Sequence, residues 1–131
     1  MMKRVTGLGG IFFKTKDPKS LGEWYKKHLD LPVDEFGAVF KWIDPNNKEA
    51  TVPAQTVWSP FEESSTYFNP SEKPYMFNYR VENLVELLKV LKAEGVTIVG
   101  GMQEYPYGKF GWIMDPEGNK IELWEPNDEG F

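Results

Sequence analysis

The sequence predicts an α+β fold in which two tandem βαβββ modules build one cupped, mixed sheet. Two observations carry this prediction. First, "WIDPNNK" at 42–48 and "WIMDPEGNK" at 112–120 nearly repeat each other, and each is followed by a tryptophan two residues before a proline, in "TVWSP" and "ELWEP". Second, each copy falls at the same point in a series of one strand, one helix and about three strands. We therefore expect a single domain over 1–131, with module 1 at about 5–60, a linker at 61–74 and module 2 at about 75–126.

Module 1 begins with a strand, "GIFFKTK", at 10–16. A helix follows it, because Asp17 can act as N-cap and Pro18 suits the first helical position. Spacings of three and four give this helix one apolar stripe, formed by Leu21, Trp24 and Tyr25. The helix should end near "HLDLPV", and the remaining apolar runs, "GAVFKWI" and "ATVPAQTVW", then read as strands.

Module 2 repeats this order at an offset of 66 residues, starting from "MFNYRVE" at 76–82. Asn83 is its expected N-cap, with Glu86 three residues on, and Gly95 is its expected helix stop. The strands that follow are "VTIVG", "KFGWIM" and "KIELWE", and "DPEG" at 115–118 fits a tight turn between the last two.

The segment between the modules, "SPFEESSTYFNPSEKP" at 59–74, has a linker composition. Its Tyr67 and Phe68 suggest that it packs against the domain. A helix covers one face of each module's sheet, so the other face is free to line a cup. We expect a binding site in that cup, built from equivalent strands of both modules.

Composition excludes several classes of function. The chain has a net charge of −5 and no basic patch, which argues against a nucleic-acid partner. It has no apolar run of about 20 residues, so we expect no membrane span, and no signal-peptide pattern follows "MMKRVTGLGG". It has no cysteine, which rules out disulfides, thiolate metal ligands and a cysteine nucleophile. We expect a cytoplasmic protein.

Three stretches together resemble the vicinal oxygen chelate superfamily, which includes glyoxalase I, bleomycin-resistance proteins, fosfomycin-resistance enzymes and extradiol dioxygenases. They are "GIFFKTKDPKSLGEWYKKHLDLPV", "MFNYRVENLVELLKVLKAEGV" and "YGKFGWIMDPEGNKIELWEP", and the resemblance covers about residues 5–126. It implies a glyoxalase-like fold. It leaves the function open, because that superfamily contains lyases, epimerases, oxygenases and binders without activity.

The resemblance also implies where a metal would bind, on the first and last strands of each module. The matching first-strand positions are Gly10 and Met76, and the last-strand position of module 2 is Glu122. In module 1 the match is Thr56, or Gln55 after a slip of one residue. Only Glu122 offers the donor that the pattern asks for, since divalent metals need three or four converging N or O donors. We therefore predict no metal and no other cofactor.

Residues two apart on a strand share a face, so the same alignment predicts the lining of the cup. The expected lining residues are Phe12, Lys14, Thr56, Trp58, Met76, Asn78, Arg80, Glu122 and Trp124. The stretch "QEYPYGKFGW" at 103–112 reads as a loop, which could fold over the cup and bring Tyr105 or Tyr107 to a ligand.

Each of these roles has a structural alternative. Glu122 is a candidate general base whose pKa an apolar cup would raise, or else it forms a salt bridge with Arg80 or Lys120. Lys14 and Arg80 would anchor an anion, or lie exposed at strand ends. Trp58 and Trp124 would stack on a planar ligand, or belong to the core or a dimer interface.

Three further residues complete this list of alternatives. Met76 fits a pocket filler better than a ligand of a metal. His28, the only histidine, fits an exposed helix end. Tyr107 contacts a ligand, or belongs to an ordinary connection.

Three functions are consistent with these residues. The first is a small-molecule-binding protein of the glyoxalase or bleomycin-resistance kind, which holds a small aromatic or acidic ligand without metal and forms a homodimer. The second is a metal-independent lyase or isomerase that uses Glu122 as base, with Lys14 or Arg80 holding the developing anion. The third is a glyoxalase-type metal lyase with Glu122 as a metal ligand, which the other ligand positions disfavour.

Overall fold

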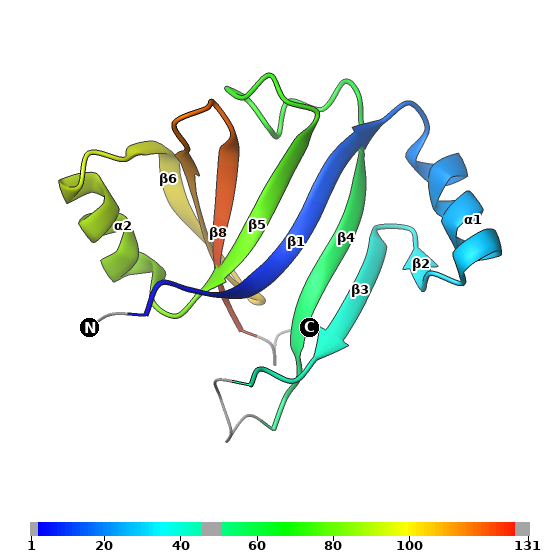
Figure 1. Cartoon of the computed structure of the whole chain (residues 1–131), viewed down its shortest axis with the longest axis horizontal. Helices are drawn as coiled ribbons and strands as arrows, with labels where there is room; N and C mark the ends of the chain where they lie inside the picture. Colours follow the sequence, from blue (N-terminus) through cyan, green and yellow to red (C-terminus); the bar gives the residue numbers. More distant parts are fainter. Residues whose placement is uncertain (1–2, 46–50, 128–131) are drawn as a thin grey trace.

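A computed structural model describes residues 3–45 and 51–127 of the chain, and it shows a curved mixed sheet with two helices (Figure 1). The elements follow one another in the order β1 Val5–Thr15, α1 Pro18–Leu29, β2 Val33–Asp34, β3 Gly37–Trp42, β4 Ala54–Glu62, β5 Tyr75–Val81, α2 Leu84–Ala93, β6 Thr97–Tyr105, β7 Gly108–Met114 and β8 Lys120–Pro126. The predicted α+β fold and its βαβββ repeat are confirmed. The repeated phrase is only partly visible, because Asn46, Asn47 and Lys48 lie outside the described residues.

The sheet has eight strands in the order β2-β3-β4-β1-β5-β8-β7-β6. Each half keeps the same pattern, in which the first strand of the module lies parallel to its last strand. The halves join where β1 and β5 run antiparallel, with Gly10 opposite Asn78 and Phe12 opposite Met76. Figure 1 shows α1 and α2 toward opposite ends of the curved sheet.

Both helices begin at the residues that the sequence predicts. The Asp17 carboxylate accepts a hydrogen bond from the Ser20 backbone N–H, and the Asn83 side chain accepts one from the Glu86 N–H. These caps satisfy N–H groups that have no partner within the helix. α2 ends just before Gly95, whose φ of +86° favours glycine.

The sheet carries a different core on each face. On the helix side of module 2, leucines of α2 pack against Val81 and Leu123. On the opposite face, Phe12, Met76 and Trp112 form a second cluster around Phe68, which comes from the linker. The linker therefore packs against the domain, as expected from its aromatic residues, and it does so over the cup, part of which it closes.

The stretch at 103–112 is an ordinary connection between two strands, the second of the two readings of this segment, and not a loop that folds over the cup. β6 continues to Tyr105 and β7 begins at Gly108, so the two strands form a hairpin with Pro106 and Tyr107 at its turn. Gly108 has a φ of +139°, and a Cβ there would lie 2.4 Å from the Glu125 carbonyl oxygen. The glycines therefore serve a tight connection, and they do not make the segment a lid.

Candidate functional site

Glu122 is the centre of the cup. It lies on β8 opposite Asn78 of β5 and is only 2% exposed. Asn78 Nδ2 donates to Glu122 Oε1 at 2.7 Å, and Trp112 Nε1 donates to Oε2 at 2.9 Å. The Tyr67 hydroxyl also donates to Oε2. All three donors are uncharged. Asn78 and Trp112 lie on the sheet, and Tyr67 lies in the linker.

Burial raises the pKa of Glu122 above its ordinary value, because an ionised carboxylate loses its hydration there. The hydrogen bonds from Tyr67, Trp112 and Asn78, and the charge of Lys120, lower it and only partly offset the burial. Burial and the adjacent carboxylate likewise raise the pKa of Tyr67. Tyr67 therefore stays protonated and acts as a donor to Glu122.

The two cations that were expected to pair with Glu122 make other contacts. Lys120 Nζ donates to the Tyr67 carbonyl oxygen at 2.7 Å and lies over the rings of Tyr67 and Trp112. The Arg80 guanidinium lies between Trp42 and Trp124, at 5.5 and 5.3 Å from the ring centroids, and donates to the Gln55 carbonyl oxygen. Lys120 thus acts on Glu122 through space, and Arg80 is held on tryptophan faces.

Two adjoining cavities surround this centre. The inner cavity, of about 140 Å³, is lined by Gly9, Phe12, Val57, Asn78, Tyr107, Phe110, Glu122 and Trp124. The outer cavity, of about 260 Å³, is lined by Tyr67, Gln103, Tyr105, Tyr107, Phe110 and Trp112. Tyr107 and Phe110 border both cavities, so a ligand could extend from one into the other.

Five of the predicted lining residues come together at the inner cavity: Phe12, Asn78, Tyr107, Glu122 and Trp124. Trp124 stacks on Phe110 with ring centroids 5.8 Å apart, and its Nε1 donates to the Tyr107 carbonyl oxygen. Met76 is buried in the cluster with Phe12 and Phe68, as a pocket filler would be. Its sulfur lies in an apolar environment.

Trp58 is placed differently from the prediction. Its ring packs on Phe13 of β1 and on Tyr25 of α1, at centroid distances of 5.2 and 5.0 Å. It therefore belongs to the helix-side packing of module 1. The reason is a one-residue difference in register on β4, since Val57 is the residue that lines the inner cavity.

The same register on β4 decides whether the side chain of Thr56 or that of Gln55 faces the cup. Thr56 accepts a hydrogen bond from Trp42 Nε1 at 2.8 Å and donates to the Leu8 carbonyl oxygen at 2.6 Å, so its hydroxyl is used in joining strands. Gln55 shares a face with Val57 because side chains alternate along β4. The position expected of Thr56 in the cup is thus taken by its neighbours.

Lys14 and Arg80 lie too far apart to hold one small anion. Arg80 is opposite Gly7, and Lys14 lies seven positions further along β1, which is about 20 Å of strand. Lys14 Nζ lies 5.6 Å from the centroid of Phe68, beside the linker. The two residues are equivalent in the repeat and yet occupy opposite ends of the cup.

Tyr67 and Trp112 are the contacts of Glu122 that the sequence analysis did not assign to the site. Tyr67 could not be placed by strand alternation, because it comes from the linker. Trp112 lies opposite Glu122 on β7, in the repeated phrase itself. Its position in "WIMDPEGNKIELWE", at the other side of a tight turn from Glu122, was the available indication.

The residues at the metal positions of the glyoxalase-like pattern do not fit a divalent ion. Gly10 has no donor, the Met76 thioether is packed among aromatic rings, and both Glu122 oxygens already accept hydrogen bonds. Within residues 3–45 and 51–127, no three His, Cys, Asp or Glu side chains are grouped so as to hold a metal ion. The absence of a metal remains a prediction, which the donor chemistry supports.

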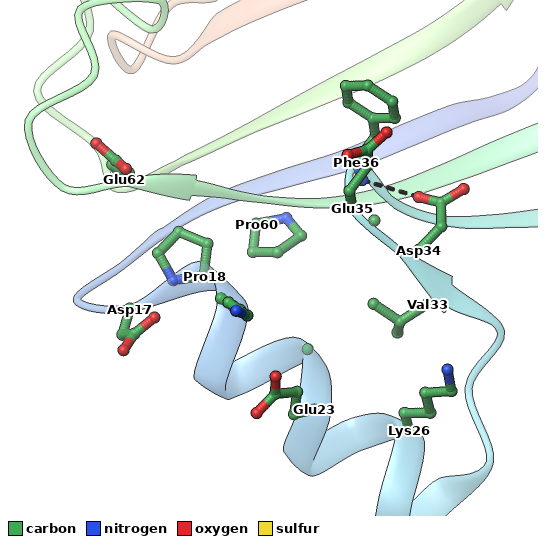
Figure 2. Close-up of a pocket in the computed structure, with 13 residues that line it drawn as sticks. Asp17, Pro18, Glu23, Lys26, Val33, Asp34, Glu35, Phe36, Pro60 and Glu62 are labelled. Atoms are coloured by element: carbon green, nitrogen blue, oxygen red, sulfur yellow. Dashed lines mark hydrogen bonds between the residues drawn. The ribbon is translucent and has the colours of Figure 1, made fainter.

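A larger cavity, of about 530 Å³, lies outside the cup between α1 and the β2–β3 turn (Figure 2). Its lining includes Glu23, Lys26, Asp34, Glu35 and the exposed Phe36. Figure 2 shows Asp34 bonded to the backbone of Phe36, with Glu23 and Lys26 on the helix opposite. The carboxylates and lysines here lie at the surface, and none of them is buried against the cavity, so we place the site in the cup.

The chain has a glyoxalase-like fold, which solved structures of epimerases and of a glyoxalase share. A methylmalonyl-CoA epimerase from Mycobacterium tuberculosis matches it with a TM-score of 0.60 and 21% identity, over 96% of this chain and 91% of that one. The epimerase from Streptomyces coelicolor, in complex with 2-nitronate-propionyl-CoA, has a TM-score of 0.68 and 12% identity, over 94% and 99%. A Mn(II)-bound glyoxalase from Novosphingobium aromaticivorans has a TM-score of 0.57 and 13% identity, over 95% of this chain and 40% of that chain.

No family model matches the sequence, and no curated protein matches it significantly. At identities of 12 to 21%, the structural similarity establishes the fold alone. The chemistry of the site must therefore be argued from this chain's own residues. No helix in the described part of the chain is long and apolar enough to cross a membrane.

Proposed function

We propose that the cup binds a flat, largely apolar small molecule without a metal ion. One observation carries the proposal, namely that side chains from both modules line an aromatic cavity whose inner end is the buried Glu122. A buried carboxylate is costly to fold around, so its position at a cavity indicates a use for it. The solved structures of similar fold include one in complex with 2-nitronate-propionyl-CoA, which supports a small-molecule site in this fold.

The aromatic walls indicate the shape of the ligand. Phe110 and Trp124 are nearly parallel, at 8°, and Tyr107 contacts Phe110 edge-on. Flat faces of this kind bind flat, apolar groups through dispersion and the exclusion of water. The inner cavity has room for about one ring, and the outer cavity would take the rest of the molecule.

Calorimetric titration with single-ring aromatic compounds tests this proposal. Trp124→Ala removes a wall of the inner cavity and should weaken binding about tenfold or more. Trp58→Ala, on the helix face of the same sheet, is the matched control and should leave the affinity unchanged. Equal loss of affinity in both variants, or no binding of any aromatic probe, would overturn the proposal.

A second function, proton transfer at Glu122, is favoured by the raised pKa of this carboxyl at the edge of a cavity. In this case Glu122 would take a proton from a carbon beside a carbonyl group and return it, leaving no net change in the atoms of the substrate except their configuration. The similar fold of two epimerases supports this alternative.

Deuterium exchange separates the two functions. A carbonyl compound that binds should gain deuterium from D₂O at the carbon next to the carbonyl group if Glu122 is a base, and Glu122→Gln should abolish the gain. Binding with no exchange would leave the binding function alone. Activity toward the methylglyoxal–glutathione hemithioacetal that a chelator abolishes would revive a metal mechanism.

We also propose that the protein is a cytoplasmic homodimer. Its support is the exposure of large apolar side chains such as Trp24, Leu29 and Phe36, which a partner surface would cover. Sedimentation equilibrium tests the dimer, and a monomer at micromolar concentration would contradict it.

A further inference from the structure

The two oxygens of Glu122 have different surroundings. Oε2 accepts hydrogen bonds from Tyr67 and Trp112, which line the outer cavity, whereas Oε1 accepts one, from Asn78. Glu122 and Asn78 line the inner cavity, and neither Tyr67 nor Trp112 does. The Oε1 edge of the carboxylate therefore faces the inner cavity, with capacity to accept a further hydrogen bond.

Asn78 adds a second acceptor beside it. Because Asn78 Nδ2 donates to Glu122, its Oδ1 points the other way, and in the described structure this buried oxygen has no hydrogen-bond partner. Reversing the amide would set Oδ1 against the carboxylate, which is unfavourable. Gly9 makes room for this oxygen, since a Cβ at Gly9 would lie 2.1 Å from it. A buried acceptor without a partner marks a place where a donor is missing.

The cations of the cup do not border this inner end. None of the three is among the residues that line the inner cavity: Lys120 is bonded to the Tyr67 carbonyl oxygen, and the Arg80 guanidinium lies over the rings of Trp124 and Trp42. Lys14 is at the far end of β1, beside Phe68. An anionic ligand group at the inner end would thus meet a carboxylate and an amide oxygen, with repulsion that the low-dielectric cavity strengthens.

We propose that the ligand enters the inner cavity as an aromatic ring carrying an N–H or O–H donor, neutral or cationic, which bonds to Glu122 Oε1 and Asn78 Oδ1. The aromatic walls accept the ring, and the acceptor pair selects the donor and rejects a carboxylate. This inference rests on the proposed function, because it requires that the cup bind a small molecule. The sequence left open whether the ligand is aromatic or acidic, and this inference selects the aromatic class.

Matched probes test the inference by calorimetric titration or ligand-observed NMR at pH 7. 3-Methylindole and 1-methylindole are isomers of the same size, and only the first keeps the N–H donor; benzamidine and benzoate are rings of similar size with opposite charge. We expect 3-methylindole to bind about tenfold or more tightly than 1-methylindole, in line with the loss of one hydrogen bond to a charged group. Benzamidine should bind more tightly than benzoate.

The outcomes separate this inference from the proposed function. Equal affinity within the indole pair, or tighter binding of benzoate, would overturn the inference and leave the cup as a binding site. Failure of all four probes to bind would overturn both.

A variant then shows whether Glu122 is responsible. Glu122→Gln should remove most of the preference for benzamidine over benzoate, whereas the matched change Glu117→Gln, in the exposed turn before β8, should preserve it. If Glu122→Gln kept the same preference, this would contradict the proposal that the donor of the ligand bonds to Glu122. Circular dichroism confirms that both variants are folded.

Discussion

Glu122 shows how single residues set the chemistry of the cup. Its carboxyl group is buried, and the three groups that hydrogen-bond to it are uncharged. Neutral donors stabilise the ionised form less than a bonded cation would, so burial remains the larger effect and the pKa stays raised. A buried carboxyl with a perturbed pKa at the edge of a cavity is typical of a functional group, which suits either binding of a donor or proton transfer.

Tyr67→Phe removes one of these donors and keeps the ring. We expect the pKa of Glu122 to rise further, because the hydrogen bond from Tyr67 lowers it. We expect a loss of about 1.5 kcal/mol in the free energy of unfolding at neutral pH, where the carboxylate is left with one donor fewer. NMR titration of the labelled carboxyl carbon and urea unfolding measure the two effects. Tyr105→Phe, whose hydroxyl bonds to Gln103 at the surface, is the control.

The pH dependence of the free energy of unfolding should also report the titration of Glu122. A carboxyl whose pKa is raised by folding keeps its proton up to a higher pH in the folded state than in the unfolded chain. The resulting stability is present below the ordinary pKa of 4.5 and is lost as the pH rises from there through the raised pKa. Glu122→Gln lacks this dependence, so the wild type should lose stability relative to it over that range. A stability difference that stays constant as the pH rises above 4.5 would refute the raised pKa.

Gly9→Ala should disturb Asn78 and Trp124 at once. The new Cβ would lie 2.1 Å from Asn78 Oδ1 and 3.0 Å from a Trp124 ring carbon, so the amide or the ring must move. Overpacking of this kind costs about 1 to 3 kcal/mol, and the binding of aromatic probes should weaken with it. Gly101→Ala is the matched control, because its Cβ would meet nothing within 4 Å. Urea unfolding of both variants checks the stability.

At the scale of the elements, the linker is the part that turns an open sheet face into a site. Its Phe68 is fully buried among Phe12, Met76 and Trp112, and its Tyr67 bonds to Glu122. Lys120 fixes the same segment through the Tyr67 carbonyl oxygen. The linker is therefore part of the cup's core, and it also supplies a wall of the outer cavity.

Phe68→Ala tests this structural role. Removing a fully buried phenylalanine costs about 3 to 5 kcal/mol, and the linker should lose its protection from hydrogen exchange. Ile43→Ala, at a side chain that is 70% exposed, should be almost neutral. A small effect of Phe68→Ala, similar to that of Ile43→Ala, would show that the linker does not hold the cup together.

At the scale of the whole molecule, the repeat builds a pseudo-twofold sheet whose two halves have diverged. The β1–β5 pairing brings equivalent strands together in the middle, but Gly10 stands where module 2 has Met76, and neither supplies a metal donor suited to this site. The symmetry of the fold is thus kept, while the polar residues of the site come mostly from module 2 and the linker.

Metal removal tests the molecule as a whole. Protein purified without a histidine tag should contain far less than one metal ion per chain, and its melting temperature should not change with a chelator, because no bound metal would be lost. Near-stoichiometric metal, or a fall in melting temperature with the chelator, would contradict the metal-free site.

Local patterns were enough to predict much of the fold. Asp17 and Asn83 are helix caps, and the strand–helix–strand order follows from apolar periodicity, because these depend on neighbours in the chain. The resemblance to the vicinal oxygen chelate pattern, combined with strand alternation, implied that Glu122, Asn78 and Trp124 share one face, and all three line the inner cavity. The same combination misplaced Trp58, because a shift of one residue on β4 reverses every side chain and the first module lacks the compact turn that fixes the register in the second.

The sequence by itself determined the two-module α+β fold and the helix boundaries, since these follow from short-range spacing, and the resemblance to a known family added the expectation of an aromatic cup centred on Glu122. Only the tertiary structure decided that Tyr67 reaches Glu122, that Arg80 lies between two tryptophans and that Lys14 is at the far end of the cup. These contacts join segments far apart in the chain, and their geometry depends on strand pairing and on how the linker packs, which no local pattern records.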